Sequence, residues 1–154
     1  MYYFNKKVFT IKQKFFRDKR GYFCETFNKK LFDMDFGSKI KFIQDNLSYS
    51  KKGVFRGLHF QNKPYGQCKL VQVLDGEIID FVVDIRYKSK DFGKFIKLKL
   101  SSNNKKQLFI DSGFAHGFLT TSNSALVSYK VDKYYNKQSS ITLNLFDKDL
   151  SINI

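Results

Sequence analysis

The stretch KLVQVLDGEIIDFVVDI, residues 69–85, is the clearest indication of the fold. Two runs rich in Val, Ile and Phe flank Asp75-Gly76, a dipeptide that typically joins the strands of a hairpin. We therefore expect two paired antiparallel strands here. Further short β-type runs follow, at 94–100, 107–110, 116–121, 125–135 and 141–146. Many short strands at this spacing are typical of an all-β sandwich or barrel.

One short helix is expected outside these strands. Residues 28–37 begin at Asn28, a plausible N-cap, and end at Gly37, a typical stop. The chain of 154 residues fits one domain, 1–154, with 42% hydrophobic and 18% aromatic residues to form a core.

The net charge of +14 favours anionic partners such as nucleic acid, acidic lipid or nucleotide phosphates. A general lysine bias on a solvated surface explains the charge equally well. The lysines are scattered without a long basic run, which weakens the nucleic-acid alternative. An RNA-binding β domain nevertheless stays open at this point, and it would show a steep salt dependence of affinity.

The cysteine spacing, the N-terminal segment and the lengths of the apolar runs lead us to expect a cytoplasmic protein. Cys24 and Cys68 form no CxxC pair, and we expect reduced thiols. The first residues, MYYFNKKVFTIKQKFF, carry lysines throughout and lack the apolar centre of a signal peptide. No apolar run reaches the length that crosses a membrane.

The stretch GVFRGLHFQN, residues 53–62, places Arg56 three residues from His59 in a chain with 24 lysines and only four arginines. Arginine grips phosphate or carboxylate through two parallel bonds, which lysine cannot do. Strand alternation puts His59 and Arg56 on opposite faces. A bulge near Gly57 could bring Arg56 to the face of His59. Alternatively, His59 is an ordinary core histidine with a satisfied hydrogen bond.

His116, Asp80 and Asp84 are further candidates for a functional site, although each of them alone is weak evidence. His116 lies in DSGFAHGFLT, and a structural role is equally open for it. Asp80 lies in the middle of an apolar strand, where a buried carboxylate needs a partner, and a histidine is a natural one. Asp84 shares its face, and one or both could instead lie at a solvated rim. Two histidines alone would need carboxylates to hold a metal, and no third histidine exists.

Taken together, four stretches resemble, in order and spacing, the dTDP-4-dehydrorhamnose 3,5-epimerase family of nucleotide-sugar epimerases. They are RDKRGYFCETF, FIQDNLSYSKKGVFRGLHFQ, GQCKLVQVLDGEIIDFVVDIR and SGFAHGFLTTSNSALVSYKVDKYY. The resemblance runs from about residue 8 to about residue 150. It implies a cupin jelly-roll barrel with short peripheral helical turns, no metal and no cofactor, and usually a homodimer.

By this resemblance, the chain inverts C3, C5 or both in a nucleoside-diphosphate 4-keto-6-deoxy sugar. His59 would be the base, Tyr129 the acid on the opposite face of the sugar, and Lys69 the cation at the enolate oxygen. Positions that would hold the nucleotide, the diphosphate or the pocket are Arg20, Phe23, Glu25, Gln44, Asn46, Arg56, His116 and Tyr134. The resemblance leaves open the base, thymidine or guanosine, and the sugar, a hexose or a GDP-linked heptose. A binding protein or an impaired homologue remains the alternative.

The chain departs from the family at DKDLSINI, where many members continue with a segment that brings an aspartate to the catalytic histidine. Another carboxylate could orient His59, the base could be tuned differently, or activity could be reduced. We expect Asp80 to hydrogen-bond a pocket histidine and to hold its tautomer, His116 rather than His59.

Overall fold

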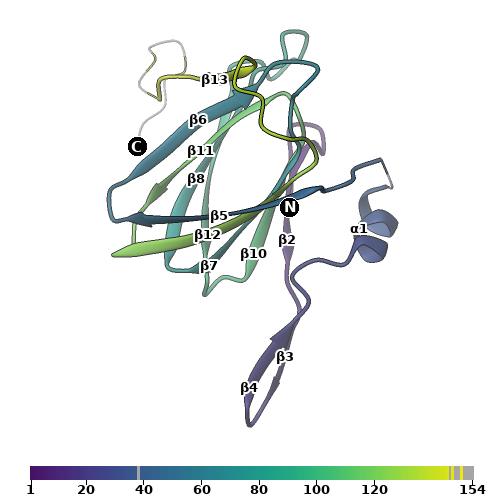
Figure 1. The fold of residues 1–154 in the computed structure, drawn as a ribbon, viewed down its shortest axis with the longest axis vertical. Coiled ribbons are helices and arrows are strands. Elements are labelled where there is room, and N and C mark those ends of the chain that lie inside the picture. The colour runs from purple at the N-terminus through teal and green to yellow at the C-terminus, as the bar shows by residue number, and fades with distance from the viewer. Residues whose placement is uncertain (38, 146, 148–149, 151–154) are drawn as a thin grey trace.

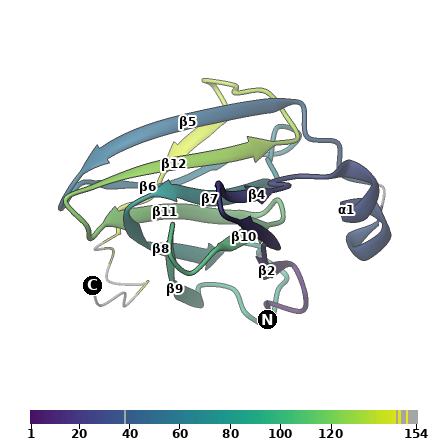
Figure 2. The same cartoon turned by 90° about the horizontal axis from the view of Figure 1, so that it is seen from below.

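Two antiparallel sheets pack face to face in the computed structural model, which describes residues 1–37, 39–145, 147 and 150 (Figures 1 and 2). The first sheet has the order β1 (Tyr2–Tyr3), β2 (Val8–Lys12), β10 (Lys106–Ile110), β7 (Lys69–Asp75), β12 (Ser124–Val131), β5 (Gln44–Lys51). The second has the order β13 (Ser140–Thr142), β6 (Phe55–Gln61), β11 (Phe114–Thr120), β8 (Glu77–Asp84), β9 (Phe95–Ser101). The expected all-β jelly-roll is confirmed.

The hairpin expected at Asp75-Gly76 is wrong. β7 pairs with β10 and β12, whereas β8 pairs with β11 and β9, so the turn carries the chain from one sheet to the other. Val71 and Val73 of β7 and Ile78 and Val82 of β8 share one core cluster. The two strands therefore meet through their side chains, and both of their hydrogen-bonding edges are already occupied.

Three apolar clusters hold the layers together. The central one fills the space between the sheets and includes Val71, Ile78 and Leu108, none of them exposed. A second covers the outer face of β6, β8 and β11, where Leu145 packs. A third lies on the outer face of the first sheet and contains Phe32 of α1 (Lys29–Phe36). The second and third clusters thus pack against parts of the two outer faces, while the central cluster joins the sheets to each other.

The helix and most strands follow the sequence expectations. Asn28 caps α1 by accepting from the Leu31 N–H, and the helix stops at Gly37, where φ is 90°. The run expected at 125–135 ends as a strand at Val131. The run expected at 141–146 forms β13 only as far as Thr142; residue 146 and most of DKDLSINI lie outside the described residues.

The bulge expected near Gly57 is present. β11 pairs His116 with His59 but Phe118 with Arg56, so β6 has one extra residue in this interval. Gly57 has a φ of 131°, and a Cβ there would lie 2.5 Å from the Gly117 Cα. Only glycine allows this approach. The extra residue puts Arg56 on the same side of the strand as His59.

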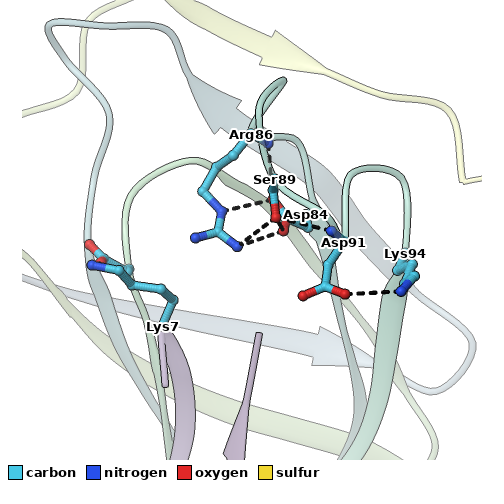
Figure 3. Close-up of polar contacts among 7 residues, drawn as sticks. Lys7, Asp84, Arg86, Ser89, Asp91 and Lys94 are labelled. Carbon is cyan, nitrogen blue, oxygen red and sulfur yellow. Dashed lines mark hydrogen bonds and ion pairs between the residues drawn. The ribbon is translucent and has the colours of Figure 1, made fainter. Parts of the chain in front are cut away.

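A hairpin and a loop extend from the sandwich. β3 (Phe15–Asp18) and β4 (Gly21–Cys24) pair only with each other, and their hairpin projects beyond the two sheets (Figure 1). The loop after β8 is held by Asp84, which Arg86 and Ser89 surround, while Asp91 pairs with Lys94 (Figure 3). Asp84 is completely buried, so the solvated-rim alternative does not apply to it.

Candidate active site

A cleft of about 630 Å³ opens between the two sheets. This volume is within the range of small-molecule sites. It gathers polar side chains from both layers: Arg56 and His59 from β6, Lys69 from β7, His116 from β11, Tyr129 from β12 and Thr142 from β13. The three residues expected to be catalytic thus share one cleft with Arg56 and His116.

His59 is the more accessible of the two histidines. Its Nδ1 lies 3.0 Å from the Thr142 Oγ1. Partial burial lowers the pKa of His59, and the charges of Lys69, His116 and Arg56 lower it further. Near neutral pH the imidazole is therefore uncharged, which is the form that can take a proton.

His116 is buried and contacts a buried carboxylate. Its Nε2 lies 2.8 Å from the Asp80 Oδ2, and Asp80 is completely buried. The expected contact of Asp80 with His116, rather than with His59, is confirmed. Burial raises the pKa of Asp80, while the nearby His116 and Lys69 oppose the rise without cancelling it.

Lys69 and Tyr129 reach the cleft from the opposite sheet. Desolvation lowers the pKa of Lys69 to about 8, with the negative charge of Asp80 acting in the other direction. Burial raises the pKa of Tyr129, and Arg56 opposes this. Near neutral pH the cleft therefore presents a cationic amine, a protonated phenol and a neutral imidazole. Those three groups can remove a proton next to a carbonyl, stabilise the resulting oxyanion and return a proton.

Arg56 is fixed at the cleft wall by β5, which precedes β6 in the chain and belongs to the other sheet. Its Nε donates to the Ser50 Oγ at 2.8 Å and its Nη2 donates to the Tyr49 carbonyl at 3.0 Å. The guanidinium is thereby held in one orientation close to the base. A fixed fork of this kind suits a phosphate.

The structure keeps the other predicted binding residues outside the lining of this cleft. Arg20 and Phe23 are exposed on the β3–β4 hairpin, and Arg20 pairs with Asp18. Glu25 follows the hairpin and accepts from Asn28. Gln44 and Asn46 bond each other on the face of β5 that carries Ser48, a lining residue. Tyr134 is exposed, and its neighbour Tyr135 lines the cleft instead.

Thr142 lines the cleft but was not expected from the sequence, and it is the most important residue of this kind. It lies directly opposite His59 in the pairing of β13 with β6. A threonine in a short alternating run carries no chemical signal of its own. Its importance follows only from the register, which the sequence did not reveal.

Gln61 lies two residues after His59, where a metal-binding cupin would place a second histidine of the same strand, and its side-chain amide is engaged in hydrogen bonds. Gln61 donates to the carbonyls of Tyr65 and Tyr134 and accepts from the Asn136 N–H. Within the described ranges, no group of three or more His, Cys, Asp or Glu is arranged to hold a metal. Cys24 and Cys68 are free thiols, as expected.

Comparison with known proteins identifies the family. The profile of dTDP-4-dehydrorhamnose 3,5-epimerase matches residues 5–154. The chain belongs to this family. The dTDP-4-dehydrorhamnose 3,5-epimerase of Shigella flexneri is 46% identical over 145 residues, which are 94% of this chain and 80% of that protein.

Solved structures of dTDP-sugar epimerases share the fold. The epimerase of Legionella pneumophila in complex with dTDP-4-keto-L-rhamnose is 42% identical, with a TM-score of 0.92 over 96% of this chain and 78% of that one. ChmJ, a 3'-monoepimerase of Streptomyces bikiniensis in complex with dTDP-quinovose, is 27% identical, with a TM-score of 0.89 over 95% and 74%. Among the described residues, none of the helices has the length and apolar character needed to span a membrane.

Proposed function

We propose that this epimerase inverts C3, C5 or both in a dTDP-linked 4-keto-6-deoxy sugar, in the biosynthesis of deoxysugars for surface polysaccharides. The observation that carries the proposal is the set of His59, Lys69 and Tyr129 in one cleft, approached from two opposite sheets. The dTDP-sugar relatives support the substrate class over a GDP-linked heptose. They also give no support to a binding protein without activity.

The chemistry follows from the acidity of a proton next to a ketone. When His59 removes that proton, negative charge moves onto the C4 oxygen, where the cationic Lys69 stabilises it. Tyr129 lies on the other wall and returns a proton to the opposite face, which inverts the carbon. No redox change occurs, so His59, Lys69 and Tyr129 suffice without a cofactor.

This assignment sets a pH dependence. His59 must be neutral to act as the base, so turnover falls at acid pH as its imidazole takes up a proton. Lys69 must be charged, and its pKa is about 8, so turnover also falls as the pH rises through that value. The two groups together give a bell-shaped profile around neutral pH.

Deuterium uptake from D₂O, followed by NMR, tests the function and the roles together. Wild-type protein with a dTDP-linked 4-keto-6-deoxyhexose should take up deuterium at the carbons it inverts, with the GDP-linked heptose as the comparison substrate. His59→Asn should abolish uptake at every carbon. Tyr129→Phe should slow inversion by about 10²- to 10⁴-fold while exchange persists, because the first proton can still leave and return from the same face. Equal and total loss of exchange in both variants would contradict this division of roles.

The nucleotide-binding assignments are compatible with a homodimer. Arg20 and Phe23 are exposed on the β3–β4 hairpin, which projects from the sheets, and neither is among the residues that line the cleft of their own chain. In the proposed homodimer a second copy supplies them, and two-fold symmetry makes the exchange reciprocal. In this arrangement each cleft combines its own His59 with the partner's hairpin.

Mixing two inactive variants tests that arrangement. Arg20→Ala and His59→Asn should each be impaired alone. After unfolding and refolding together, each mixed dimer should hold one cleft with His59 and an intact partner hairpin, so about a quarter of all sites regain full activity. Lys19→Ala on the same hairpin serves as the charge-matched control. Absence of any recovery, with mixed dimers verified by mass, would place Arg20 in its own chain's function.

A further inference from the structure

Three polar side chains form a row across the second sheet. In the pairing of β6, His59 lies opposite Thr142 of β13 on one side and opposite His116 of β11 on the other. All three residues line the cleft. The two imidazoles are therefore adjacent, but each has its own neighbour on its far side.

The two histidines are anchored by different chemistry. The His116 Nε2 contacts the Asp80 carboxylate at 2.8 Å, whereas the His59 Nδ1 contacts the Thr142 hydroxyl at 3.0 Å. In the part of the chain that the structure describes, Thr142 is the one side chain that hydrogen-bonds the His59 ring. Within those residues, the group that contacts the Nδ1 atom of the base is thus a neutral hydroxyl.

We propose that Thr142 is the positioning residue of the base: its Oγ1 accepts from the His59 Nδ1–H and so keeps the lone pair on Nε2. The proposal rests on the proposed function, because it assigns His59 the role of base. A hydroxyl that donated to Nδ1 instead would leave the hydrogen on Nε2, and the imidazole could not take the substrate's proton from that side.

A hydroxyl anchor suits the charges around His59. Lys69, His116 and Arg56 all disfavour the imidazolium, whereas a neutral hydroxyl adds no countercharge that would hold a proton on the ring between turnovers. Thr142 accepts from the same Nδ1–H before and after the base takes its proton, so the contact needs no rearrangement. The β-branched side chain has few rotamers, and its backbone is fixed by pairing with β6.

Substitutions at Thr142 separate the hydroxyl from the shape. Thr142→Val keeps the branching and removes the acceptor; we expect kcat to fall by about 10- to 100-fold with little change in KM, as is usual when a histidine loses its orienting partner. Thr142→Ser keeps the hydroxyl and should recover most of the loss. Thr10→Val, on β2 in the other sheet, is the matched control and should retain wild-type turnover.

The tautomer is a readout that needs no substrate. Nitrogen-15 NMR of the His59 imidazole should show the hydrogen on Nδ1 in the wild type and in Thr142→Ser, and a mixture of tautomers in Thr142→Val. A hydrogen fixed on Nε2 in the wild type, or wild-type kcat in a folded Thr142→Val, would overturn the proposal. If Thr142→Val does not fold, the wild-type tautomer alone decides. Failure of the proposed function is distinguishable, because it would appear as absent exchange in wild type with the Nδ1–H tautomer intact.

Discussion

Asp80 and Asp84 lie on the same face of the same strand, β8, and both are completely buried, yet their surroundings are opposite in kind. Asp84 accepts from the Arg86 backbone N–H, from the Arg86 Nε and Nη2, and from the Ser89 hydroxyl. Among the described residues, Asp80 accepts only from His116, and its Oδ1 has no hydrogen-bond partner there. The same residue type at the same depth is thus fully satisfied in one place and half satisfied in the other.

The difference in contacts appears in the two pKa values. Burial alone would raise the pKa of Asp84, but the bonds from Arg86 and Ser89 outweigh it, and the pKa is lowered. Burial also raises the pKa of Asp80, and there the contact with His116 does not reverse the effect. A complete shell of donors stabilises the charged form and the fold, whereas an incomplete one leaves a carboxylate whose charge the protein tolerates at a cost. We interpret the first as a clasp for the loop and the second as part of the site.

The largest stability effect is expected at Asp84. Asp84→Asn removes the negative charge from the Asp84–Arg86 ion pair and leaves the Arg86 guanidinium without its carboxylate partner. Breaking such a pair costs about 3 kcal/mol of unfolding free energy, which for a chain of this size lowers Tm by roughly 6–12 °C. Chemical denaturation measures the loss. Asp91→Asn is the control, because its ion pair with the exposed Lys94 contributes about 0.5 kcal/mol.

The pH dependence of that loss has a defined sign. The pKa of Asp84 is lower in the folded state than its unfolded value of about 3.9. Its contribution is therefore fully present only above about pH 5 and disappears as the pH falls through the unfolded and then the folded pKa. The unfolding free energies of wild type and Asp84→Asn should converge in acid. A constant difference down to the lowest measurable pH would mean that shape, not charge, holds the loop.

The sequence was informative about which residue types form the site and less so about which surfaces meet. Alternation and Asn28–Gly37 predicted the strands and the helix because those signals are local. Asp75-Gly76 misled because a tight turn fits two architectures, and only the occupied edges of β7 and β8 decide between them. Arg20 was placed by motif, but its hairpin projects from the sheets, which no local signal encodes.

Strand register explains why the sequence predicted one of the two histidine contacts in the site and not the other. His116 and Asp80 were expected as partners, since a buried carboxylate on an apolar strand needs one. Thr142 was not expected as a partner of His59, because a hydroxyl has many other uses and the pairing of β13 with β6 is a long-range contact. Roles that depend on charge burial were thus predictable, and those that depend on cross-strand position were not.

A smaller effect on stability, but a clear one on turnover, is expected at Asp80. Asp80→Asn keeps a group that can bond the His116 ring but removes the charge that fixes its tautomer. We expect kcat to fall by about 10- to 100-fold, the usual size for loss of a supporting contact to a site histidine.

The pKa of Asp80 is raised in the folded state, so its ionised form opposes folding above the unfolded pKa, and the neutral Asn relieves that cost. Unfolding free energy at neutral pH should therefore stay equal to wild type or rise, which is the opposite of Asp84→Asn. Both variants are compared with wild type in kcat and in unfolding free energy. Asp84→Asn should lose stability but keep its kcat per folded molecule. Asp80→Asn should lose kcat but keep its stability. If Asp80→Asn instead unfolds as readily as Asp84→Asn and retains kcat when folded, the two carboxylates have the same structural role, and the half-satisfied shell of Asp80 has no functional meaning.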